Sequence, residues 1–525
     1  MKKSPFFIGA MLLLVACGSS NNKTVSNTEV ETKAEVNPVK YANTITQNEI
    51  KEMLYIYASD EFEGRLTGAP GQKKAVEYLK NQYTSMGIGS AYNNDDYFQE
   101  VPLEKQQVAK STLSVNGTNF KPFENQFCIS GGKTGTMQAN EVVYVGFGVE
   151  TDSYSDYGDI DVKGKVVLMK AGEAKNEDGT YVTSGDIQPT KWTNPRQAMA
   201  SKRNVAKDKG AIAVILMDDT MYGPYSGYFS RMAESGTSGR MSLKSNDVSI
   251  PMFMVNKTFA TNLHPTISED NSVKSIPTDF KVAIESKSEN LESENVVAFI
   301  KGSEKPDEVL VISAHLDHEG VKNGEVYNGA DDDGSGTIAI VEIAEAFKTA
   351  INDGYKPKRS ILFLHVTGEE KGLLGSRYYT DMDPIFPLEN TIANLNIDMI
   401  GRIDPKRKSN NRNYVYLIGS DKLSTELHNI SEEINAKYCN IELDYTYNDE
   451  NDPNRYYYRS DHYNFAKNNI PVIFYFNGTH DDYHKPTDTP DKIEYDLLEN
   501  RARLVFYTAW ELANRDARII VDKAE

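Results

Sequence analysis

The chain has little cysteine, few basic residues relative to acidic ones and no long apolar segment at its start. Three cysteines in 525 residues exclude a fold built on disulfides, and the pairing of Cys128 and Cys439 is left open. Lysine and arginine number 57 against 76 aspartates and glutamates, and the formal charge of −19 excludes nucleic acid or an anionic membrane surface as the main partner. The length suffices for two domains with substantial cores.

The N-terminus has the pattern of an export signal. Lys2 and Lys3 precede an apolar run over residues 6–16, which is shorter than the roughly 20 residues of a membrane-spanning helix. "LVAC" resembles a bacterial lipobox, so we expect a signal peptide over 1–16 and a lipid on Cys17. The alternative is an ordinary signal peptide with a chance cysteine. We therefore expect an exported protein on the bacterial outer membrane, on its periplasmic side or at the cell surface, that touches the membrane only through this lipid.

Three further segments differ in composition. Residues 17–45 are polar and carry few large apolar side chains, which predicts a flexible tether. Residues 46–110 contain an amphipathic helical pattern ending near Gly87, and we assign them to the N-terminal part of the main domain. Residues 111–285 alternate short β-rich runs with loops and show few clusters of metal-ligand residues, which predicts a β-rich or α/β insert without chemistry of its own.

Residues 286–525 alternate apolar strands with helical stretches. The strands are expected in "EVLVISAH", "RSILFLHVTG", "TIANLNIDMIG", "NYVYLIGS" and "PVIFYFNG". Alternating strands and helices predict an α/β fold with a mostly parallel sheet covered on both faces. Ligands of such sheets bind beyond the carboxyl ends of the strands.

Polar residues gather at those ends. They lie in "SAHLDH", "GADDDGSG", "TGEEKGLLGS", "NIDMIGR" and "GTHDDYHKPTDTP". Imidazole and carboxylate are both zinc ligands, and a catalytic zinc usually takes three protein ligands. Five residues provide six bonds to two ions if one carboxylate bridges, so the sequence predicts a di-metal site.

The triplet Asp331, Asp332 and Asp333 supplies the expected bridge. Neighbouring side chains diverge, so only Asp332 is expected to reach both ions, while Asp333 bonds amides at the start of the next helix. A calcium-type or solvated acidic loop is the alternative, and it would need no histidine at the same edge.

Similar reasoning applies to the neighbouring ligand candidates. Of Glu369 and Glu370, one should bind metal and the other act as general base. Asp317, two residues beyond His315, would share its face and accept its free ring N–H. His318 would then lie on the opposite face, with a structural or solvent role.

The remaining histidines have weaker contexts. His365 is expected to be a core residue, His462 and His480 are weaker ligand candidates, and His264 and His428 lie outside the motifs. His315 and His484 have the best contexts of the eight.

The motifs together resemble a known family. "HLD", "GADDDGSG", "TGEEKGLLGS", "NIDMIGR", "RSDHYNFA" and "YHKPTDTP" look like the M28 family of di-zinc aminopeptidases. "DIDVKGKVVLMKAG" and "AKDKGAIAVILMDD" resemble its protease-associated (PA) insert, and "EGRLTGAPG" its N-terminal segment. The resemblance implies an α/β zinc-exopeptidase (phosphorylase/hydrolase-like) three-layer sandwich, with an M28 catalytic domain over 286–525 and a PA domain over 111–285.

The resemblance also implies roles for individual residues and two Zn²⁺ ions. It places His315 and Asp398 on one zinc, Glu370 and His484 on the other, and Asp332 on both. It also implies Glu369 as the general base, Asp317 as the partner of His315, and a cis peptide after Asp332. The oxyanion of the reaction would be stabilised by Tyr457, or by the neighbouring Tyr456 or Tyr458.

The expected reaction is hydrolysis of the N-terminal residue from peptides. Two zinc ions would lower the pKa of a water molecule, whose proton Glu369 would accept. A carboxypeptidase is one alternative and would need a basic pocket, for which Arg402, Arg455 and Arg459 are near. A one-zinc glutaminyl cyclase and a lipid-anchored binding protein without catalysis are the others.

Overall fold

The computed structural model describes residues 36–525 except 93–95, 195–196, 236–238, 245–248 and 524–525. The expected signal peptide, the lipidated Cys17 and most of the tether lie outside the described residues. The tether was expected to reach residue 45, and this is wrong for its last residues. Helix α1 (Val39–Ala42) is folded, and Tyr41, Ala42 and Ile45 are buried. The ring of Tyr41 stacks on Trp510, so a few apolar side chains suffice to anchor this segment.

A mixed sheet forms the core of the main domain. Its principal strand order is β19-β18-β20-β17-β13-β16-β12-β2-β9, with β1 beside β12. The four neighbouring strands β20, β17, β13 and β16 are parallel, as the sequence predicts. Beyond these four central strands the sheet is mixed, because β16–β12, β12–β2, β2–β9 and β18–β20 pair antiparallel, whereas β18–β19 is parallel. The strands are β1 (Gly89–Ser90), β2 (Phe98–Gln107), β9 (Gly239–Leu243), β12 (Ser288–Ile300), β13 (Lys305–His315), β16 (Arg359–Val366), β17 (Thr391–Ile397), β18 (Tyr414–Ile418), β19 (Glu442–Asp444) and β20 (Val472–Phe476).

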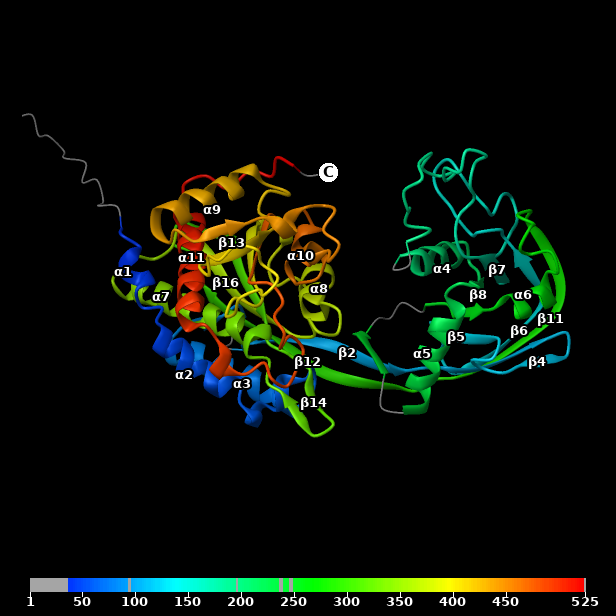
Figure 1. Ribbon diagram of the computed structural model, residues 1–525, viewed down its shortest axis with the longest axis horizontal. Coiled ribbons are helices and arrows are strands. Elements are labelled where there is room, and N and C mark those ends of the chain that lie inside the picture. The colour runs from blue at the N-terminus through cyan, green and yellow to red at the C-terminus, as the bar shows by residue number, and fades with distance from the viewer. Residues whose placement is uncertain (1–35, 93–95, 195–196, 236–238, 245–248, 524–525) are drawn as a thin grey trace, which may run out of the picture. The chain divides into compact units, whose positions relative to one another are not determined.

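Helices cover both faces of this sheet, which gives the expected three layers (Figure 1). Helices α7 and α11 contact β13 and β16 on one face, while α10 contacts β17 and β20 and packs on α8. The strands in the middle are buried on both sides; every residue of β16 and β17 is buried. The helices are α2 (Gln47–Tyr57), α3 (Pro70–Met86), α7 (Gly336–Asn352), α8 (Leu374–Asp381), α9 (Thr425–Tyr438), α10 (His462–Ala466) and α11 (Tyr495–Asn514).

The expected helix before residue 88 is confirmed as α3. Its buried residues include Val76, Leu79 and Tyr83, which recur at helical spacing. Gly87 ends it in the left-handed conformation with φ +66°, a conformation that glycine adopts without steric cost.

A second sheet lies between residues 110 and 285. Its order is β4-β3-β11-β6-β7-β8-β10-β5, and β6, β7, β8 and β10 run parallel to their neighbours in that stretch. Its elements are β3 (Lys110–Val115), β4 (Thr118–Phe120), β5 (Gln126–Ser130), β6 (Gly135–Tyr144), β7 (Val166–Lys170), α4 (Ala198–Asp208), β8 (Ala213–Met217), α5 (Tyr222–Ser235), β10 (Met252–Val255), α6 (Lys257–Leu263) and β11 (Lys274–Glu285). Apolar clusters pack on both faces of it.

Within the described residues, no helix is long and apolar enough to span a bilayer. Cys128 and Cys439 are both free thiols, and burial raises the pKa of each to about 12.

Candidate metal centre

The candidate ligands come from separate segments that end at one edge of the sheet. His315 is the last residue of β13, Asp398 follows β17 directly, and Glu370 lies four residues beyond β16. Asp332 lies in the turn over residues 330–335 that leads into α7, and His484 lies in the loop after β20. Because β13, β16, β17 and β20 are parallel, their carboxyl ends meet at this edge.

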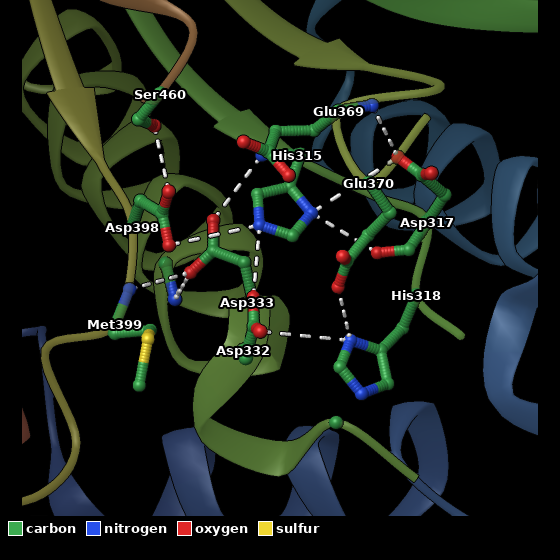
Figure 2. A network of polar contacts seen from close by, with 12 residues as sticks. His315, Asp317, His318, Asp332, Asp333, Glu369, Glu370, Asp398, Met399 and Ser460 are labelled. Atoms are coloured by element: carbon green, nitrogen blue, oxygen red, sulfur yellow. Dashed lines mark hydrogen bonds and ion pairs between the residues drawn. The ribbon is translucent and has the colours of Figure 1, made fainter. Parts of the chain in front are cut away.

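Asp332 lies between two groups of ligand atoms. Its Oδ1 is 3.1 Å from His315 Nε2, and the same nitrogen is 3.6 Å from Asp398 Oδ1. Its Oδ2 is 3.0 Å from His484 Nε2, which is 3.2 Å from Glu370 Oε2. Figure 2 shows Asp332 with His315 and Asp398 on one side and Glu370 on the other. The two oxygens of one carboxylate thus face two different sets of ligands.

The donor atoms fit divalent cations. His315 Nε2 and Asp332 Oδ2 are buried and make no hydrogen bond among the described residues. Each nevertheless lies close to other possible metal-ligand atoms of the cluster. Burial lowers the pKa of His484, but Asp332 and Glu370 outweigh burial and raise that pKa to about 10. The carboxylates therefore favour positive charge here. Imidazole nitrogens and carboxylate oxygens gathered in this way are the ligand set that zinc prefers.

The other two aspartates of the triplet support the turn, as expected. Asp333 Oδ1 accepts hydrogen bonds from the amides of Gly336 and Met399, both at 3.0 Å, and Gly336 begins α7. Asp331 Oδ1 accepts from the amide of Gly401 at 2.6 Å. The peptide between Asp332 and Asp333 is cis, which confirms that expectation. The triplet is one inward-facing carboxylate with two neighbours that fix the backbone.

Among the described residues, three sets of side chains bring possible metal-ligand atoms together: His315, Asp332 and Asp398; His318, Asp332 and Glu370; and Glu319, Glu370 and His484. Glu369 lies beside this cluster but belongs to none of these sets. Its amide donates to Asp317 Oδ1 at 3.1 Å, and its side chain lines the same pocket as Asp332 and Asp398. Burial raises the pKa of Glu369 well above its usual value; His315 opposes this shift, and the nearby Asp398 adds to it. A carboxylate with a raised pKa next to a metal site is suited to accept and return a proton.

The carboxylate of Asp317 does not accept a hydrogen bond from the ring of His315, as was expected, but binds other groups. The ring nitrogen His315 Nδ1 lies 3.0 Å from the backbone oxygen of Asp317 and 4.0 Å from its carboxylate. The carboxylate instead accepts from Thr67 Oγ1 at 2.6 Å and from the amide of Glu369. Regular strand alternation stops at His315, so the geometry on which that expectation depended does not extend to Asp317. The partner of the His315 ring is still residue 317, but through its main chain.

The expected position of His318 is wrong. His318 is fully buried in the cluster, with Nδ1 at 2.8 Å from Glu370 Oε1 and 3.8 Å from Asp332 Oδ2 (Figure 2). Its ring also meets that of His484 edge-on, with centroids 5.7 Å apart. The reason is again the end of the strand at His315, after which the chain turns and pairs with Leu66. His318 holds one oxygen of Glu370 while the other faces His484.

Ser460 is a residue of the site that the sequence did not single out. Its hydroxyl donates to Asp398 Oδ2 at 2.6 Å and accepts from Asn396 Nδ2 at 2.9 Å. Asn396 Oδ1 in turn accepts from Ser313, so a buried polar chain orients Asp398. The serine of the quoted motif "RSDHYNFA" was the available signal.

Tyrosines border the pocket beside the cluster. Tyr456 and Tyr483 line it together with Asp332, Glu369 and Asp398. Tyr483 stacks on His484 with ring centroids 3.9 Å apart. Burial and the carboxylates of the cluster raise the pKa of Tyr483 far above its usual value.

Tyr457 is not among the residues that line this pocket, and Tyr458 is not either. The ring of Tyr457 packs against His462 and lies under the ammonium of Lys422. Its role in catalysis stays a prediction, whereas Tyr456 and Tyr483 line the pocket together with Asp332, Glu369 and Asp398. Tyr483 was missed, although it directly precedes His484.

The three arginines considered as binding partners for the terminal carboxylate of a substrate have different surroundings. Arg402 is bound to Asp482 at 3.0 Å. Arg455 lies over the ring of Tyr458. Arg459 alone of the three lines the pocket, where its guanidinium lies over Tyr456.

The other histidines lie outside the cluster. His365 is a core residue, as expected; it bonds Tyr83 OH at 2.6 Å, and burial lowers its pKa to about 3. His462 stacks on Phe474. His480 Nε2 lies 3.2 Å from Oδ2 of Asp331, in the turn over residues 330–335. His264 and His428 lie near Asp270 and Ser420.

Comparison with known proteins gives matches in both halves of the chain. Residues 295–509 match Peptidase family M28 and residues 138–263 match the PA domain. A probable lipoprotein aminopeptidase, LpqL, of Mycobacterium tuberculosis is 26% identical over 351 residues, or 65% of this chain and 56% of the relative. A probable leucine aminopeptidase 2 of Aspergillus oryzae is 27% identical over 351 residues, or 66% and 56%.

Among solved structures, an aminopeptidase from Aneurinibacillus sp. strain AM-1 aligns with a TM-score of 0.49 at 18% identity. The alignment covers 93% of this chain and 99% of that one. The matched part spans little more than half the length of the two curated relatives. The motifs quoted from the sequence are consistent with these matches: residues 295–509 are similar to peptidase family M28 and residues 138–263 to the PA domain.

Proposed function

We propose that this protein is a zinc aminopeptidase that holds two ions and removes the N-terminal residue from peptides. The observation that carries the proposal is the position of Asp332, whose two oxygens lie 3.1 Å from His315 and 3.0 Å from His484. His315 and Asp398 would hold one ion, Glu370 and His484 the other, and Asp332 both. Two relatives named as probable aminopeptidases support the reaction class.

When bound, a pair of zinc ions supplies Lewis acidity and lowers the pKa of water. Glu369 would accept the proton of the attacking water, since its carboxylate lines the pocket and is no member of the ligand sets. The same carboxyl group would then deliver that proton to the departing amine. The backbone amide of Glu369, bound to Asp317, keeps this residue in place through both steps.

The carbonyl oxygen of the scissile bond gains negative charge as water attacks. A hydroxyl group that donates to this oxygen stabilises the transition state. We assign this role to Tyr483, because it lines the pocket with Glu369 and stacks on His484. Tyr457, the residue expected from the resemblance, is not among the residues that line this pocket.

The proposal also includes the cellular location of the protein and the boundaries of its segments. One relative is named as a lipoprotein, which supports export and a lipid anchor at Cys17. The outer membrane as the site of anchoring, the signal peptide over 1–16, and the divisions at residues 110 and 285 are part of this proposal.

The deciding experiment compares free and N-acetylated aminoacyl anilides with the zinc-loaded protein. Hydrolysis confined to the free substrates supports an aminopeptidase. Equal rates on both would exclude it, and hydrolysis only of peptides with a free C-terminal carboxylate would indicate a carboxypeptidase. Cyclisation of N-terminal glutamine would indicate a glutaminyl cyclase, and inactivity on all of these a binding role.

A further inference from the structure

Residues 63–67, "EGRLT", lie against the metal centre but supply none of its expected ligands. Arg65 in this segment is 1% exposed and takes a left-handed conformation with φ +50°. Among the described residues no carboxylate lies within ion-pair distance of its guanidinium. A fully buried cation without an acidic partner is costly unless other acceptors surround it.

The guanidinium of Arg65 donates to four backbone carbonyls. Nε bonds Leu316 O at 3.1 Å, Nη1 bonds Tyr57 O at 3.1 Å and Asn328 O at 2.7 Å, and Nη2 bonds Gly329 O at 2.9 Å. The ring of Tyr57 lies 4.6 Å from the guanidinium carbon. Every acceptor is a main-chain oxygen, so the hydrogen bonds of this side chain fix the backbone positions of the segments that it contacts.

Two of those loops carry the candidate ligands His315 and Asp332, whose Nε2 and Oδ1 atoms lie 3.1 Å apart. Leu316 directly follows His315, whereas Asn328 and Gly329 lead into the turn that carries Asp332. One side chain therefore connects the end of β13 to the turn before α7. A planar guanidinium with donors on several edges spans these carbonyls, and a lysine ammonium, being a single point, does not.

The rest of the segment bonds the same end of β13. Thr67 Oγ1 donates to Asp317 Oδ2 at 2.6 Å, and the amide of His318 donates to Arg65 O at 3.2 Å. At Gly64, a Cβ atom would lie 2.5 Å from Tyr327 O, so only glycine fits against the strand before Asn328. The segment is thus held in place on both sides of Arg65.

We propose that Arg65 is a positioning residue that fixes the separation between the His315 loop and the Asp332 turn and so sets the affinity for the metal ions. The inference rests on the proposed two-metal function. It goes beyond that function because Arg65 touches neither the ions nor the substrate.

The test measures zinc affinity by competition with a chelator for wild type, Arg65→Lys and Arg65→Gln, each as the full chain. Arg359→Gln is the control: Arg359 is 0% exposed and donates to the carbonyls of Leu512 and Arg515, and also to the carboxylate of Glu308. It begins β16, at the end of that strand opposite to Glu369. The melting temperature of each metal-free variant reports the purely structural loss.

We expect the Arg65 variants to lose about 10- to 100-fold in zinc affinity, the range seen when residues that orient metal ligands are changed. Arg359→Gln is expected to lower the metal-free melting temperature and to keep the wild-type affinity. The visible absorption of the Co²⁺ form should change in the Arg65 variants alone. Guanidinium ion added to Arg65→Gly should restore part of the affinity.

Two results would overturn the inference. One is a wild-type affinity in both Arg65→Lys and Arg65→Gln; the other is an equal loss of affinity in Arg359→Gln at an equal loss of melting temperature. If Arg65→Gln does not fold, Tyr57→Phe decides, because it removes only the second donor to Leu316 O, at 2.9 Å. It should weaken zinc binding by a smaller factor, and no change would count against the inference. A wild-type protein that binds no zinc would overturn the proposed function as well.

Discussion

The imidazole of His318 lies 2.8 Å from the carboxylate of Glu370, measured from Nδ1 to Oε1. Glu370 directs its other oxygen, Oε2, to within 3.2 Å of His484 Nε2. A side chain that occupies one oxygen of a ligand carboxylate determines how the other oxygen is presented.

This contact predicts that His318→Ala lowers zinc affinity about 10- to 100-fold. His318→Gln should retain more of it, because an amide can still donate to Glu370. The control is His428→Ala on α9, whose ring bonds Ser420 away from the cluster. Chelator competition measures the affinities, and an unchanged value in His318→Ala would show that Glu370 is positioned without this contact.

Glu369→Gln should reduce kcat about 10²- to 10⁴-fold, because the variant loses the group that transfers protons. Its zinc content should equal that of wild type, since Glu369 belongs to none of the ligand sets. Turnover of aminoacyl anilides and metal analysis on the same samples check both statements. Loss of metal together with activity would mean that Glu369 is a ligand.

Tyr483→Phe should lower kcat about 10²-fold with a small change in KM, since the lost hydrogen bond is made to charge that develops in the transition state. Tyr457→Phe is the paired variant, and we expect it to stay near wild type because Tyr457 does not line the pocket. The reverse order of effects would restore the assignment that the family resemblance implies.

Glu342 on α7 predicts a pH dependence of stability away from the metal centre. Burial raises its pKa from 4.5 to about 8, and its Oε2 accepts from the amide of Thr46 at 3.2 Å. Between these two pH values the unfolded chain has released the proton and the folded chain has kept it, so the free energy of unfolding falls as the pH rises.

Glu342→Gln keeps the acceptor for Thr46 and removes the titration. It should melt close to wild type near pH 5 and at a higher temperature than wild type near pH 8. Thermal unfolding at the two pH values is the measurement. A difference between the proteins that does not change with pH would contradict the expected titration.

The sequence predicted the elements whose signals are local. Continuous apolar runs indicated β13, β16, β17, β18 and β20, and the positions of polar residues after them indicated the edge at which the ligands meet. The role of Asp333 followed from capping chemistry, and Gly336 confirms it. These inferences needed only strand direction and the divergence of neighbouring side chains.

The errors arose where the chain leaves regular structure. Alternation along β13 stops at His315, so it could not place Asp317 or His318. The contacts of Arg65 join residues more than 250 positions apart, and no spacing in the sequence encodes them.

The antiparallel outer strands β2 and β12 are charged and half exposed, so their pattern did not indicate a continuation of the buried sheet.

The central claim is that Asp332 holds two zinc ions in one site. Elemental mass spectrometry of the purified full chain, dialysed against zinc and then freed of excess metal, tests it most directly when wild type is compared with Asp332→Asn. The account predicts two zinc ions per wild-type chain and no more than one in the variant. One ion or none in wild type, or two in both proteins, would contradict it.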